Sequence, residues 1–129
     1  MHMRQWLLLG LTLFATAAYA VDKERYTPER LAALQAEGAL VLVDVFADWC
    51  PTCARQQAVL GRYVEQRPDV DLHILEVDFD EDRQYVRELR APRQSTLLLF
   101  RGEQQYWYSV AETREDVIFE AIDRAAAAQ

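Results

Sequence analysis

The chain has 129 residues, of which 51% are hydrophobic and 27% are charged, and its formal net charge is -7 at pH 7. This length fits one domain, and the composition is that of a globular protein rather than a disordered one. An acidic chain with a pI of about 4.8 lacks the basic surface that binds nucleic acid, so we expect no nucleic-acid partner.

The first twenty residues differ in composition from the rest. They contain Arg4 and no acidic residue, then an apolar run from Trp6 to Ala15, and they end in Ala18-Tyr19-Ala20, which suits a cleavage site. The apolar run is shorter than the ~20 residues that a membrane-spanning helix needs. We therefore predict a signal peptide at residues 1–20 and one domain at residues 21–129, with an uncleaved membrane anchor as the alternative.

The first half of this domain shows clear helix and strand signals. Thr27 and Pro28 are typical of a helix start, and Gly38 is a typical stop. The run from Ala39 to Ala47 is apolar and rich in valine, apart from Asp44, which predicts a strand buried on both faces. Apolar residues at helical spacing then predict a helix over residues 50–66.

The second half continues the alternation of strands and helices. We expect strands at 72–78, 95–100 and 105–110, and helices at 81–89 and 113–126. The last two strands are joined by residues 101–104, which is short enough for a hairpin. Parallel crossovers followed by an antiparallel hairpin predict an α/β fold: a central mixed β-sheet flanked by helices on both faces.

The segment Trp49-Cys50-Pro51-Thr52-Cys53 contains the two cysteines of the chain, at the predicted junction of a buried strand and a helix. A CxxC pattern in this context is a redox motif. Helix N-termini favour a thiolate, so Cys50 is the expected nucleophile, and Cys53 is close enough to resolve a mixed disulfide.

From Leu42 through the motif to Thr96-Leu97-Leu98-Leu99-Phe100, the sequence resembles the thioredoxin superfamily, and in particular small exported bacterial members. The resemblance implies a thioredoxin-like fold with a largely exposed first cysteine. It also implies that Asp44 lies buried behind the cysteines and helps to move the proton of Cys53. The residues expected at the substrate surface are Trp49, Pro51, Thr52, Gln94 and Ser95.

Two positions depart from the family pattern. The family often has a lysine near the buried acid, and our alignment places Ile74 there. The family also has a cis-proline before the Thr-Leu-Leu-Leu-Phe strand, where this chain has Ser95. A cis bond without proline costs about 3 kcal/mol, so we predict a trans Gln94–Ser95 bond. We also expect serine to open space over Cys50, to weaken general reductase activity and to permit some soft-metal binding.

The predicted function is thiol–disulfide exchange with protein substrates in the periplasm, as a monomeric reductant without a cofactor. Electrons would then come from a membrane-bound redox partner. One alternative is a soft-metal-binding or metallochaperone-like module using the same two cysteines, but the sequence offers no further cysteine to complete a site. A redox-inactive interaction domain is the other alternative, although so tight a disulfide loop stabilises a fold little.

The cleavage pattern gives a direct prediction: the exported protein should begin at Val21. Removal of residues 1–20 leaves 13 basic and 21 acidic residues, a net charge of -8. Intact-mass measurement of the exported protein checks the cleavage site, and a mass that still includes Met1 would contradict it.

Overall fold

The computed structural model describes residues 22–128, so the predicted signal peptide lies outside the described part of the chain. The elements in chain order are β1 (Lys23–Arg25), α1 (Pro28–Ala36), β2 (Leu40–Phe46), α2 (Pro51–Gln66), β3 (Leu72–Asp78), α3 (Arg83–Glu88), β4 (Thr96–Arg101), β5 (Gln104–Val110) and α4 (Glu115–Ala127). Every predicted helix and strand is present within a few residues of its expected bounds. Strand β1 is an addition that the sequence did not predict.

The five strands form one mixed sheet in the order β1-β3-β2-β4-β5. Strand β3 is parallel to both β1 and β2, whereas β4 is antiparallel to β2 and to β5. Strand β2 is therefore central, as its apolar run predicted. Helix α1 begins as predicted too, because the Thr27 side chain accepts a hydrogen bond from the Arg30 backbone N–H at 3.1 Å.

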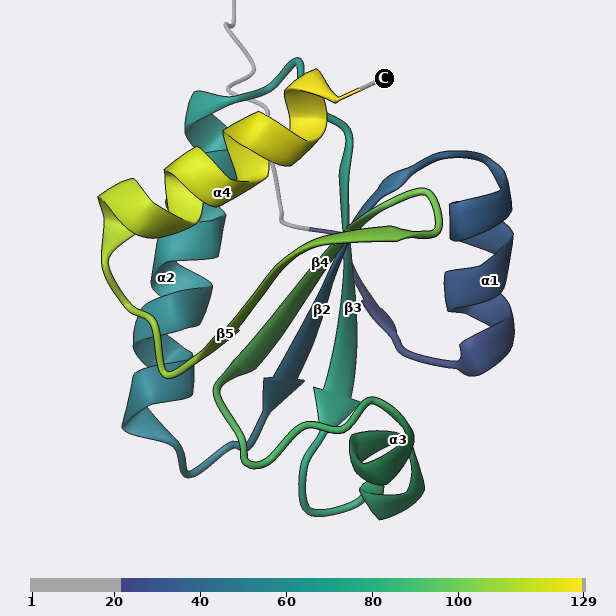
Figure 1. Cartoon of the computed structure of the whole chain (residues 1–129). Coiled ribbons are helices and arrows are strands. Elements are labelled where there is room, and N and C mark those ends of the chain that lie inside the picture. The colour runs from purple at the N-terminus through teal and green to yellow at the C-terminus, as the bar shows by residue number, and fades with distance from the viewer. Residues whose placement is uncertain (1–21, 129) are drawn as a thin grey trace, which may run out of the picture.

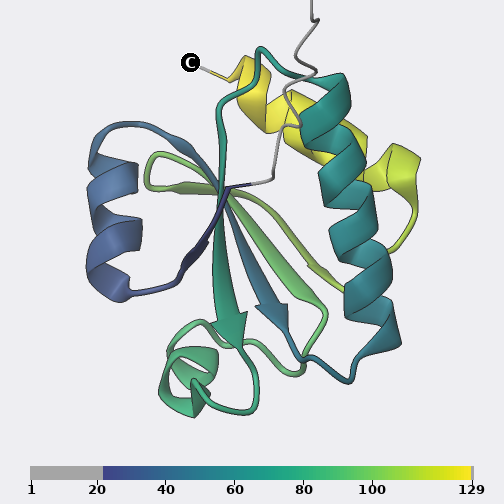
Figure 2. The ribbon, with the colours of Figure 1, turned by 180° about the vertical axis from the view of Figure 1, so that it is seen from behind.

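Helices cover both faces of the sheet. Helices α2 and α4 lie on one face, and α1 and α3 lie on the other, as the two opposite views show (Figure 1, Figure 2). The predicted α/β fold class is confirmed. No helix within residues 22–128 is long and apolar enough to cross a membrane.

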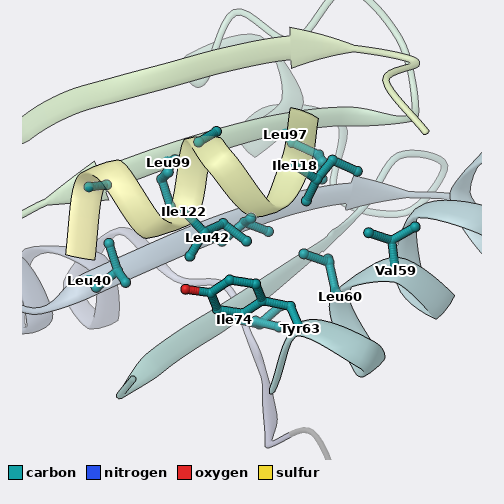
Figure 3. Packing of buried hydrophobic residues seen from close by; sticks show 12 residues of the cluster. Leu40, Leu42, Val59, Leu60, Tyr63, Ile74, Leu97, Leu99, Ile118 and Ile122 are labelled. Atoms are coloured by element: carbon teal, nitrogen blue, oxygen red, sulfur yellow. The ribbon is translucent and has the colours of Figure 1, made fainter. Parts of the chain in front are cut away.

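The core under α2 and α4 fixes the position of the helix that follows the cysteines. Its buried side chains come from the sheet and from both helices (Figure 3) and include Leu42, Leu60, Tyr63, Leu99 and Ile122. Burying each such side chain contributes roughly 1.5–3 kcal/mol. Helix α2 is therefore held against the sheet along its length, and its N-terminus lies at the carboxyl end of β2.

Alternation along β2 decides which way Asp44 faces. Leu40 and Leu42 contact the core under α2 and α4, while Val41, Val43 and Val45 contact the core under α1 and α3. Because side chains alternate between the two faces of a strand, Asp44 points to the same side as Leu42. The single charged residue of the central strand thus faces α2, the helix that carries the cysteines.

Candidate active site

The two cysteines are joined by a disulfide bond at the start of α2, with their Cα atoms 5.3 Å apart. Cys50 is the N-cap residue of the helix, and Pro51 occupies the first turn, where a missing backbone N–H costs nothing. The Cys53 backbone N–H donates a hydrogen bond to Cys50 Sγ at 3.1 Å. The same N–H and the helix dipole would stabilise a thiolate on Cys50 after reduction.

The expectation of a largely exposed first cysteine was wrong. Cys50 is only 4% exposed and Cys53 only 1%. Ser95, which is fully buried, lies over the disulfide, with its Oγ 3.4 Å from Cys50 Sγ and 3.6 Å from Cys53 Sγ, and Ala47 and Phe79 also pack against the two cysteines. Serine at this position therefore covers the sulfurs instead of opening space above them. A disulfide has no proton to give, so the hydroxyl is the donor.

Three hydrogen bonds hold the backbone of Ser95. Its N–H donates to the Val45 carbonyl at 2.8 Å, and its carbonyl accepts from Ala111 N–H at 2.9 Å and from Gln56 Nε2 at 3.1 Å. The Gln94–Ser95 bond is trans, as predicted, and Ser95 has a φ of 66°. This left-handed conformation costs a non-glycine residue of order 1 kcal/mol or more, and the hydrogen bonds offset that strain.

Gln56 is a site residue that the sequence did not reveal. It is fully buried on α2, one turn after Cys53, and its amide also donates to the Glu112 carbonyl at 2.9 Å. The amide thereby ties the helix of the cysteines to the Ser95 loop and to the segment before α4. The one signal in the sequence was the spacing: Gln56 follows Cys53 by three residues, and residues three apart lie on the same side of a helix.

Asp44 is fully buried, and its Oδ1 has no hydrogen-bond partner. Gln57 of α2 donates to the other oxygen, Oδ2, from 3.5 Å. The pKa of Asp44 is raised to about 7, mainly by burial and also by the negative charge of Glu76, while Lys23 and the hydrogen bond from Gln57 act in the opposite direction. The carboxyl is therefore poised to take up and release a proton near neutral pH.

The expectation that Ile74 lies next to the buried acid was also wrong. The strand register pairs Asp44 with Glu76 and pairs Ile74 with Leu42. The neighbour of the buried acid on β3 is thus a second acid. The nearby lysine comes from β1 instead, since Lys23 Nζ lies 3.0 Å from Glu76 Oε1. A three-residue strand is too short to show a sequence pattern, which is why this lysine was missed.

A pocket of about 340 Å³ connects the disulfide with this charged group. Both cysteines line it, together with Gln57, Glu76 and Asp48. A polar space of this size has room for water molecules. It provides a route by which protons could pass between the buried side of the cysteine pair and the surface.

The remaining predicted contact residues surround the disulfide at the surface. Trp49 is 61% exposed, and its Nε1 donates to Asp80 Oδ2 at 2.7 Å, which fixes the ring beside the motif. Pro51 is exposed, and Thr52 and Gln94 are half-buried. The fold thus brings all the predicted site residues to the carboxyl end of β2, with Asp44 beneath them.

Comparison with known proteins identifies the group to which this arrangement belongs. The family model described as Thioredoxin matches residues 22–124. The chain belongs to the thioredoxin family. As a member, it is a thiol–disulfide oxidoreductase with a CxxC pair, which confirms the predicted enzyme class.

Individual relatives support the assignment. Thioredoxin from Chlamydia trachomatis is 31% identical over 85 residues, or 66% of this chain and 81% of that protein. Thioredoxin-1 from Saccharomyces cerevisiae is 36% identical over 67 residues, or 52% of this chain and 63% of that protein. The crystal structure of Trxlp from Edwardsiella tarda is 37% identical, with a TM-score of 0.72, and the match covers 78% of this chain and 98% of that one.

The buried carboxyl predicts how stability depends on pH. A carboxyl whose pKa is higher in the folded than in the unfolded state binds more protons when folded, so unfolding becomes easier as pH rises between the two pKa values. Between pH 5 and pH 8 the oxidised protein should lose about 2–3 kcal/mol relative to the Asp44→Asn variant, given a pKa of about 7. Urea unfolding across this range measures the difference, and identical pH slopes would contradict it.

Proposed function

We propose that this chain is an exported reductase of protein disulfides in the periplasm, with Cys50 as nucleophile and Cys53 as resolving thiol. The observation that carries the proposal is the Cys50–Cys53 disulfide at the N-terminus of α2, with a buried carboxyl on the strand behind it. Export is supported by the predicted signal peptide. We further propose that the protein acts as a monomer. An oxidising compartment does not reduce the cysteine pair again, so a membrane-bound partner must supply the electrons.

The first half of the reaction uses the helix N-terminus. In the reduced protein the Cys50 thiolate attacks one sulfur of a substrate disulfide, and a bond forms between Cys50 and that sulfur as the substrate bond breaks. The other substrate sulfur leaves with the electron pair and takes a proton from water. The Cys53 backbone N–H, which contacts Cys50 Sγ, stabilises the thiolate before the attack.

The second half needs a base for Cys53. The thiol of Cys53 gives up its proton, which Asp44 accepts through the pocket that joins Cys53 with Gln57. The Cys53 sulfur then attacks Cys50 Sγ, the mixed disulfide breaks, and the second substrate thiolate leaves. Two electrons have passed from the cysteine pair to the substrate, and the enzyme disulfide is formed.

A soft-metal role receives no support from the site. No cluster of three or more histidine, cysteine or acidic side chains suited to a metal ion occurs within residues 22–128. Two thiolates alone would need ligands from a second chain to complete a zinc site. Ser95 also lies over both sulfurs of the disulfide, so the open space that was expected to ease metal binding is filled.

Trapping tests the order of attack. The Cys53→Ala variant should accumulate a mixed disulfide between Cys50 and a protein substrate such as insulin, because no resolving thiol remains. Non-reducing electrophoresis and peptide mass mapping identify the linked cysteine. The matched Cys50→Ala variant should trap none, and an equal yield from both variants would overturn the assignment.

Ser95 should tune the reduction potential of the pair. Its hydroxyl lies within hydrogen-bond distance of both sulfurs, and a charged acceptor strengthens such a bond. A thiolate on Cys50 therefore gains more from Ser95 than the neutral disulfide does. This contact favours the reduced form and makes the potential less negative.

Ser95→Ala should accordingly make the reduction potential more negative by about 30 mV, which corresponds to roughly 1.4 kcal/mol. Equilibration with glutathione measures the potential. Ser109→Ala is the matched control, because Ser109 is a second serine whose buried hydroxyl has no partner. Ser95→Pro is a poor test, since proline cannot adopt a φ of 66° and lacks the N–H that Val45 binds. An unchanged potential in Ser95→Ala would refute the tuning role.

A further inference from the structure

Two charged side chains lie near Asp44: the acid Glu76 and the base Lys23. From β3, Glu76 lies directly beside it in the strand register, at the ~4.8 Å spacing of neighbouring strands. From β1, Lys23 contacts Glu76. Helix α2 offers only the neutral amide of Gln57, and β4 offers the apolar Leu97. Within the described residues, one ion pair therefore dominates the electrostatic environment of the buried carboxyl.

This ion pair lies between the buried carboxyl and the solvent. The side chains of Lys23 and Glu76 are 25% and 24% exposed, whereas Asp44 is fully buried. Glu76 lines the pocket that contains the disulfide, where Asp48 is the other acid, and also a second pocket of about 220 Å³ that it shares with Arg25. Partly exposed ion pairs contribute little to stability, so a purely structural role explains this placement poorly.

We propose that Lys23 and Glu76 are positioning residues for the resolving step, and that their opposite charges set the pH at which Asp44 can accept the proton of Cys53. Glu76 favours the protonated form of Asp44, because a second negative charge nearby is repelled by a carboxylate. Lys23 favours the ionised form by attraction. The inference rests on the proposed role of Asp44 as the base for Cys53.

The two members of one ion pair should therefore act in opposite directions. In Glu76→Gln the repulsion is lost and Lys23 is left unpaired, so the pKa of Asp44 should fall. In Lys23→Met the attraction is lost and Glu76 is left unpaired, so the pKa of Asp44 should rise. A structural role predicts something else: both variants break the same ion pair and should disturb the site in the same direction.

The test measures Asp44 in the oxidised protein and the resolving step in the reduced one. Carboxyl ¹³C NMR titration gives the pKa of Asp44 without any reaction. Rapid-mixing kinetics with a Cys50-linked mixed disulfide gives the pH midpoint of attack by Cys53. We expect shifts of about one pH unit downward in Glu76→Gln and upward in Lys23→Met in both measurements. The double variant should return toward the wild-type value, because both charges are then absent.

Glu65→Gln is the matched control, since Glu65 is an exposed acid on α2 and its loss should move neither quantity. Shifts of the same sign in both single variants, or no shift in either, would overturn the inference while leaving disulfide reduction intact. If the NMR pKa moves but the kinetic midpoint does not, Asp44 is not the base for Cys53, and the inference falls with that role. If one single variant fails to fold, the other still gives the sign of its own effect.

Discussion

The burial of β2 on both faces is the constraint on which the rest of the structure depends. Because every residue from Leu40 to Val45 is buried, the strand has one register and one direction. That register fixes the start of α2, the face on which Asp44 lies and the Val45 carbonyl that holds Ser95. The reactive geometry is thus largely a consequence of core packing.

The same constraint explains what the sequence could predict. The apolar run of β2, the CxxC spacing and the helical periodicities are local signals, and they were enough for the fold class, the element order and the position of the cysteines. The contact between Ser95 and the sulfurs depends on the start of α2 and a loop that lies far from it in the chain. Serine alone gave no sign that its hydroxyl would cover the disulfide, so the predicted exposure of Cys50 failed.

Charge at the buried carboxyl shows a second limit of local patterns. The expected position of Ile74 beside Asp44 assumed a pairing between β2 and β3 that is two residues away from the observed one. Because side chains alternate along a strand, a shift of two residues keeps every side chain on the correct face of the sheet. The error therefore left no visible conflict in the hydrophobic pattern. Only the pairing of β2 with β3 shows that Glu76 is the neighbour, and only the addition of β1 brings Lys23 to it.

The ion pair beside Asp44 depends on the short strand β1 remaining in the sheet. It consists of three residues at the beginning of the described chain and pairs only with β3. Short edge strands with few contacts open at a lower free energy than the core. With the roles proposed above, an opening of β1 would withdraw Lys23 from Glu76 and leave two acids facing each other, which would shift Asp44 toward its protonated form and couple the redox centre to the integrity of the sheet edge.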